Sequence, residues 1–234
     1  MRMQSRNTYT NGDGLDHLDP YMSCPEAVIS LVHIEHPYLP KVIWEPCAGT
    51  GTVVHVLQAA GYELIASDIH AYDTSVNMML IDYLNFTIPG VEGIVTNTPY
   101  TRAEQFARKA IAEVPYVALL LRTNFLESVK RRPFFAAHPP TRVLIASRRL
   151  PMMHRYGWTG KRAGSNTSHA WFIWDRRPYS GPQLIWYDWR DIVEASAAVD
   201  VHIFARAPAA RGRMAIDAAG PGMCRVVTGR VTSK

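Results

Sequence analysis

Short apolar runs alternate with helical segments along most of the chain, and this alternation constrains the fold more than any other feature. Runs typical of β-strands lie at 41–45, 63–67, 93–97, 116–122, 141–147 and 169–175, and helical spacing is found at 25–34, 53–60 and 102–112. Strands and helices that alternate at such intervals favour a doubly wound parallel sheet. The run 116–122 is apolar on both sides, as central strands of such sheets are. We therefore predict an α/β, Rossmann-like fold, with the last two runs forming a strand pair at one edge.

The two ends of the chain differ in composition from this central part. Residues 1–18 are polar and lack the apolar stretch of a secretory signal, while residues 191–234 become rich in Ala, Gly and Arg without periodicity. We expect a flexible leader at 1–18, one domain at 19–190 and a loosely ordered tail at 191–234. No run approaches the roughly 18 apolar residues of a membrane span, and Cys24, Cys47 and Cys224 are too scattered for a disulfide framework or a zinc site. A cytoplasmic protein without a metal centre is expected.

A glycine-containing loop, WEPCAGTGTVV at 44–54, follows the first expected strand. Gly49 and Gly51 stand between a strand and a helix, where glycine lets the backbone approach a ligand. The dinucleotide-binding fingerprint requires a third glycine at the position of Val54, and no Lys-Ser/Thr pair follows to make a phosphate-binding P-loop. The loop therefore indicates a nucleotide-like ligand without a pyrophosphate.

Acidic residues accompany this loop. Glu45 precedes it, Asp68 ends the second expected strand, and Asp82 follows further along the chain. A carboxylate at the second strand end suits the hydroxyls of a ribose, and nearby carboxylates favour a sulfonium and an α-amino group. S-adenosylmethionine carries both cationic groups. The alternative is that Glu45 and Asp68 only cap helices.

Four motifs carry a resemblance to a known family. EPCAGTG (45–51), ASDI (66–69), DYL (82–84) and TNTPY (96–100) resemble, in order and spacing, motifs of class I S-adenosylmethionine-dependent amino-methyltransferases, and most closely DNA adenine-N6 methyltransferases of phage or prophage type. The similarity covers residues 19 to 187 and implies a methyltransferase sheet. It also implies that DPYMSCPEAV (19–28) approaches the methionine end of the cofactor. The cofactor-binding residues implied in this way are Tyr21, Ser23, Cys24, Glu45, Pro46, Gly49, Gly51, Asp68 and Asp82.

The catalytic assignment also follows from this resemblance. In the family, a side-chain oxygen and a backbone carbonyl hold the hydrogens of the amine and aim its nitrogen at the methyl group, which is catalysis by orientation. The resemblance assigns these acceptors to Asn97 and to the carbonyl of Thr98 or Pro99, while Pro99 stiffens the loop and Tyr100 stacks on the flipped base. The family usually has two prolines here, and Thr98 replaces the first, which keeps the carbonyl but lowers the rigidity. The alternative is that these residues form an ordinary turn.

Basic residues suggest the substrate. The net charge is +5, which favours a polyanionic partner. The segment 147–174, which joins the last two expected strands, mixes basic and aromatic side chains and is the predicted nucleic-acid contact, through Arg148, Arg149, Arg155, Lys161 and Arg162. A basic hairpin that serves only solubility is the alternative for this segment. The resemblance favours DNA over RNA. The competing functions are methylation of an RNA base or of a protein glutamine, or nucleic-acid binding without catalysis by a relative with a degraded site.

Overall fold

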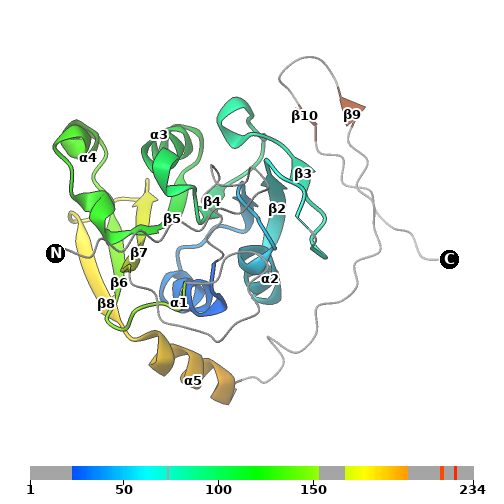
Figure 1. Ribbon diagram of the computed structural model, residues 1–234. Helices are drawn as coiled ribbons and strands as arrows, with labels where there is room; N and C mark the ends of the chain where they lie inside the picture. The colour runs from blue at the N-terminus through cyan, green and yellow to red at the C-terminus, as the bar shows by residue number, and fades with distance from the viewer. Residues whose placement is uncertain (1–22, 73, 153–166, 200–216, 219–223, 226–234) are drawn as a thin grey trace, which may run out of the picture.

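The computed structural model describes residues 23–72, 74–152, 167–199, 217–218 and 224–225 (Figure 1). The main strands are β1 (Val42–Glu45), β2 (Glu63–Asp68), β3 (Met79–Leu80), β4 (Gly93–Thr96), β5 (Tyr116–Arg122), β6 (Arg142–Ala146), β7 (His169–Asp175) and β8 (Gln183–Tyr187). A short antiparallel pair is formed by β9 (Asp217–Ala218) and β10 (Cys224–Arg225). The helices are α1 (Pro25–Glu35), α2 (Thr52–Ala59), α3 (Ala103–Glu113), α4 (Arg132–Ala137) and α5 (Trp189–Val199). Short 3₁₀ turns are η2 (Tyr83–Asn85), η3 (Tyr100–Arg102), η4 (Thr123–Leu126) and η5 (Val129–Arg131).

The main sheet confirms the predicted fold class. Its strands lie in the order β3-β2-β1-β4-β5-β7-β6-β8, and β7 alone among these eight runs antiparallel to its neighbours. The expected strand pair is present, because β7 inserts between β5 and β6 and pairs with both. A strand that the sequence analysis did not include, β8, lies beyond this pair and runs parallel to β6.

Helices cover both faces of the sheet (Figure 1). One core cluster joins α1, α2 and α5 to one face, and a second, rich in aromatic rings, joins α3 and α4 to the other. The indole N–H groups inside these cores are satisfied: that of Trp44 donates to the Ser67 hydroxyl at 2.9 Å, and that of Trp171 donates to the Ala27 carbonyl at 2.9 Å. The backbone pairings between the strands set their register, and with it the positions of the strand ends.

Helix α5 continues to Val199, so it occupies the start of the range in which the tail was predicted. The leader at 1–18 lies outside the described residues, and the domain limits stay predictions. Among the helices of the described ranges, none has the length and apolar character that crossing a bilayer requires.

The amino ends of β5 and β6 carry a buried ionic network. Arg142 donates from Nε and Nη2 to the two carboxylate oxygens of Glu35, each at 2.8 Å, and from Nη2 to Asp175 at 3.0 Å. The Tyr116 hydroxyl donates to Glu35 at 3.0 Å, and Arg177 donates to Asp175 at 2.7 Å. We call these five residues the amino-edge network. It ties α1 to three strands of the sheet.

Candidate active site

Three of the predicted site residues come together at the opposite edge of the sheet. Glu45 ends β1, Asp68 ends β2, and Asn97 directly follows β4. These strands are parallel, with β1 between the other two, so their carboxyl ends lie at one edge. Ligands of doubly wound sheets bind at this edge, where the order of the strands reverses.

The glycine loop between β1 and α2 has the backbone conformation that its sequence indicates. Gly49 has φ 52° and Gly51 has φ 90°, both in the left-handed region that favours glycine. A Cβ atom on Gly51 would lie 2.2 Å from Cγ2 of Val76, whereas a Cβ atom on Gly49 would meet no atom within 4 Å. Gly51 is therefore required for packing, and the space beside Gly49 is open to a ligand. Pro46 is buried in the turn that opens the loop.

Glu45 is a fully buried carboxylate. Its Oε1 accepts hydrogen bonds from the Thr96 hydroxyl at 2.5 Å and from the Cys47 backbone N–H at 3.1 Å. Its Oε2 has no hydrogen-bond partner among the described residues. Burial raises the pKa of Glu45 to about 8, because the charged form loses its hydration. An acid left in this state favours a cationic ligand, whose charge would stabilise the ionised form.

Asp68 holds the backbone of the glycine loop, and Asp82 holds the backbone of η2. Asp68 accepts hydrogen bonds from the backbone N–H groups of Gly49 at 2.8 Å and His70 at 3.1 Å, and burial raises its pKa. Asp82 caps η2 by accepting from the N–H of Leu84 at 3.0 Å. Each carboxylate oxygen keeps a further lone pair for a ligand, so the contacts of Asp68 with a ribose and of Asp82 with the cofactor stay predictions.

The Asn97–Tyr100 motif lies directly after β4. Thr96, the last residue of β4, donates to Glu45, so the motif begins beside the buried acid. The Pro99 carbonyl accepts the N–H of Arg102 at 3.0 Å as η3 begins. The Pro99 carbonyl keeps a second lone pair, so the carbonyls of Thr98 and Pro99 both stay candidates for holding an amine. The Thr98 hydroxyl is buried and has no hydrogen-bond partner among the described residues.

Two residues that the sequence analysis did not assign to the site contact Tyr100. The guanidinium of Arg122 lies 4.5 Å from the centre of the Tyr100 ring, and the His169 ring lies 5.6 Å from it at 41°. Burial, followed by the charge of Arg122, lowers the pKa of His169 to about 4, so this imidazole is neutral at pH 7. The two residues face each other across the antiparallel pairing of β5 and β7. No local sequence signal indicates this approach, because 46 residues separate them in the chain.

The remaining predicted residues lie elsewhere or outside the described ranges. Cys24 is buried at the start of α1, next to Ser23. Arg148 is paired with Asp188 at 3.0 Å, while Arg149 is exposed. Tyr21, Arg155, Lys161 and Arg162 lie outside the described residues, so their assignments stay predictions.

Comparisons with known proteins support the fold only. No family model matches the chain, and no curated protein sequence matches it. Among solved structures, the methyltransferase subunit of a type I restriction-modification system from Streptococcus thermophilus is similar, with a TM-score of 0.51, 9% identity, and coverage of 78% of this chain and 54% of the subunit. A protein from Lactococcus lactis assigned as a hemolysin has a TM-score of 0.50 and 10% identity, with 76% and 99% coverage. A dimethyladenosine transferase from Plasmodium falciparum has a TM-score of 0.46 and 12% identity, with 65% and 62% coverage. This chain thus spans about half the length of the restriction-modification subunit.

Proposed function

We propose that this chain is an S-adenosylmethionine-dependent methyltransferase that modifies N6 of adenine in DNA. One observation carries the proposal: the buried carboxylate of Glu45, one oxygen of which has no hydrogen-bond partner among the described residues, lies between an open glycine loop and the Asn97–Tyr100 motif. The buried carboxylate and the glycine loop suit a cationic, nucleoside-like cofactor, and the Asn97–Tyr100 motif suits a planar amine. Their position at the edge where doubly wound sheets bind ligands supports the same conclusion.

The residues present fit such a cofactor. Glu45 would face its cationic part, because the buried Oε2 of Glu45 lacks a partner among the described residues. The backbone at Gly49 would lie against it, since the space on the Cβ side of Gly49 is open. Asp68 and Asp82 would contact its ribose and base with the lone pairs that remain on their oxygens. When bound, S-adenosylmethionine supplies an electrophilic methyl group on a sulfonium.

The motif after β4 would orient the amine. The side-chain oxygen of Asn97 and the carbonyl of Thr98 or Pro99 would accept the two hydrogens of adenine N6, which leaves the lone pair of the nitrogen directed away from both acceptors and toward the methyl group. Tyr100 would stack on the displaced base, and its ring is held in place by Arg122 and His169. No strong general base is needed, because the amine becomes acidic only after it gains the methyl group.

DNA is proposed as the substrate for two reasons. The net charge of +5 favours a polyanion over a protein side chain, and the motif order resembles that of DNA adenine methyltransferases. Methylation of an RNA base or of a glutamine remains the alternative, because the same acceptors would hold any planar amine. Thr98 at the position of a family proline is the feature that favours a non-catalytic binder instead.

Transfer of tritiated methyl groups from S-adenosylmethionine to DNA, RNA and protein fractions, followed by nucleoside analysis, tests the proposal. We expect N6-methyladenine in DNA. Asn97→Ala should abolish turnover and leave cofactor binding intact, because the lost interaction belongs to the transition state. Tyr100→Ala should in addition weaken substrate binding, by about 1–3 kcal/mol if base stacking is lost.

The outcomes separate the alternatives. Tritium found only in RNA or only in protein would show that this polymer, and not DNA, is the substrate. Cofactor binding without methyl transfer to any fraction would indicate a binding module. Thr98→Pro is the matched control, since it restores the family sequence and keeps the carbonyl. We expect its activity to equal or exceed that of the parent. N6-methyladenine at parental levels from Asn97→Ala would refute the role of the motif.

A further inference from the structure

The segment that follows β5 forms a projecting shoulder next to the candidate active site. We call residues 123–132 the shoulder. It comprises η4, the two residues that link η4 to η5, η5 itself, and the first residue of α4. The Thr123 backbone N–H donates to the Ser168 carbonyl at 3.0 Å. Ser168 directly precedes His169, and Thr123 directly follows Arg122, so the shoulder starts from the two residues that contact Tyr100.

Arg131 and Phe125 fix the shape of the shoulder. Arg131 donates to three backbone carbonyls, from Nε to Phe125 at 2.7 Å and from Nη2 to Asn124 at 3.0 Å and Glu127 at 2.9 Å. Phe125 is buried against the aromatic core, and the Arg131 guanidinium lies 4.9 Å from the centre of its ring. The Ser128 hydroxyl accepts the N–H of Lys130 at 3.2 Å and caps η5. The backbone of the shoulder is thus held by side chains of its own sequence.

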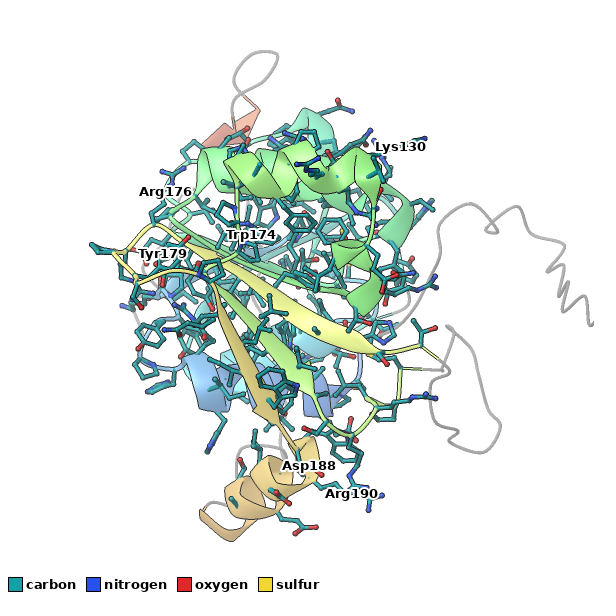
Figure 2. The ribbon with its side chains drawn as sticks, turned by 90° about the vertical axis from the view of Figure 1, so that its left-hand side faces the viewer. Lys130, Trp174, Arg176, Tyr179, Asp188 and Arg190 are labelled. Carbon is teal, nitrogen blue, oxygen red and sulfur yellow. The ribbon has the colours of Figure 1, made fainter. Side chains whose placement is uncertain are left out.

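The outer surface of this rigid segment combines apolar and cationic side chains. Val129 is 91% exposed and Leu126 is 45% exposed. Lys130 and Arg132, which are close to them in the sequence, are also exposed, and no hydrogen bond or ion pair between described residues involves either side chain. Figure 2 shows Lys130 on the outside of the molecule, far from Arg176 and Tyr179 at the other end of the view. Glu127 provides the only acidic side chain of the shoulder.

Exposure of one apolar residue is common and needs no explanation. Here two apolar side chains are held on a backbone that Arg131 fixes, they adjoin two exposed cations, and the segment begins at the candidate active site. Cations that accompany exposed apolar groups match a nucleic-acid strand, in which phosphates alternate with bases that become accessible once they leave the stack.

We propose that the shoulder binds the nucleic-acid strand next to the target base. Leu126 and Val129 contact neighbouring bases, while Lys130 and Arg132 contact phosphates. The inference rests on the proposed function, since it places the strand that enters the site beside Tyr100. It adds a contact surface outside the segment 147–174.

Binding of fluorescently labelled single-stranded DNA, measured by anisotropy, tests the shoulder. Leu126→Ser/Val129→Ser should weaken binding about three- to tenfold, because apolar contact with bases is lost. Lys130→Ala/Arg132→Ala should reduce the slope of log Kd against log salt by about 1.4, or 0.7 for each phosphate contact on a single strand. Leu184→Ser on β8 and Lys41→Ala at the amino end of β1 are the matched controls, as both residues are exposed and lie outside the shoulder.

A double-mutant cycle with the DNA gives the sharper result. Nucleotides flanking the target adenine are replaced one at a time by abasic sites. At one flanking position or more, the loss of the base should weaken binding to the parent but leave binding to Leu126→Ser/Val129→Ser unchanged. Fully additive effects at every position would overturn the contact with bases, and an unchanged salt slope would overturn the contact with phosphates.

Methyl transfer separates a failure of this inference from a failure of the proposed function. If the parent methylates DNA, Asn97→Ala does not, and both shoulder variants bind and react as the parent does, the shoulder proposal alone is refuted. If the parent binds S-adenosylmethionine but neither binds nor methylates any oligonucleotide, the proposed substrate is refuted and the shoulder proposal with it.

Discussion

The two edges of the main sheet both bury carboxylates, but they do so in opposite ways. At the amino edge, Glu35 and Asp175 are surrounded by donors, with Arg142 shared between them. At the carboxyl edge, Glu45 and Asp68 accept hydrogen bonds only from backbone N–H groups and one hydroxyl among the described residues. No Lys or Arg is paired with either of them in that part of the chain.

The pKa values of the buried acids follow this difference. Burial alone would raise the pKa of Asp175, but hydrogen bonds from Arg177 and Arg142 outweigh it and hold the pKa below its usual value. Burial raises the pKa of Glu45 to about 8, and no cation among the described residues offsets it. Removing one partner of a buried ion pair destabilises a fold, because the other charge is left buried without compensation. An unpaired buried acid is poised for a ligand that brings the missing charge.

The largest effect is expected at the amino edge. Glu35→Gln should lower the free energy of unfolding by about 3–5 kcal/mol, because it leaves the buried charge of Arg142 without its main partner. Urea unfolding measures this loss. Glu35→Leu/Arg142→Met is the control and should recover part of the stability, since Asp175 keeps Arg177. A loss below about 1 kcal/mol for Glu35→Gln would contradict the structural role of the amino-edge network, and the proposed difference between the two edges would then fail.

The same chemical change at the carboxyl edge should affect binding instead. Glu45→Gln should weaken S-adenosylmethionine binding at pH 8.5 by about 1.5–3 kcal/mol, the contribution typical of hydrogen bonds to charged groups. Its stability at this pH should equal or exceed that of the parent, because an unpaired buried carboxylate is removed. Calorimetry and urea unfolding measure the two quantities. Unchanged affinity in a folded variant would exclude Glu45 from the cofactor site.

The pH dependence of stability should have opposite signs at the two edges. The folded pKa of Glu45 is raised to about 8, so the folded state holds this proton more tightly and stability falls as pH rises from about 4 to about 8, by at most about 1.4 kcal/mol per pH unit. The pKa of Asp175 is lowered, so its contribution is present above the unfolded pKa near 4 and is lost as pH falls through the lower folded value. Urea unfolding from pH 5 to 8.5 should give a flatter profile for Glu45→Gln than for the parent. Parallel profiles would contradict this assignment.

The smallest effect is expected for an exposed charge pair at the amino ends of β1 and β2, outside the amino-edge network. Lys41 and Glu63 are 2.9 Å apart, with exposed side chains. Water screens such pairs, so Lys41→Ala should not shift the urea midpoint measurably. A clear shift of the urea midpoint would mean that an exposed ion pair also contributes to the stability of this protein, so burial would not distinguish the pairs that stabilise it.

Local patterns were sufficient to predict the central sheet and the glycine loop. The runs that became β1, β2, β4, β5, β6 and β7 are buried on at least one face, so their apolar residues reveal them. Gly49 and Gly51 adopt the positive φ angles that their position between strand and helix suggests. The positions of Glu45, Asp68 and the Asn97 motif at strand ends could also be predicted, because the end of an apolar run is visible in a short stretch of sequence.

Features that depend on distant parts of the chain were missed. Strand β3 has only two residues, and β8 is an edge strand whose Leu184 and Trp186 are exposed, so its pattern does not report a buried face. The approach of Arg122 and His169 to Tyr100 depends on the antiparallel register of β5 and β7, which no short window contains. The pairing of Glu35 with Arg142 spans 107 residues and requires the finished sheet.

Strand β7 runs against its neighbours, so its first residue lies at the carboxyl edge of the sheet and its last residue lies at the amino edge. His169 begins it beside Tyr100, and Asp175 ends it in the amino-edge network. All seven residues pair with β5, and the other side of the strand pairs with β6. Its amide hydrogens are therefore expected to exchange with deuterated solvent only when this part of the sheet opens as a unit. A ligand that binds only the closed form should slow exchange along the whole strand, so protection at Asp175 would report occupancy of the site at the opposite edge.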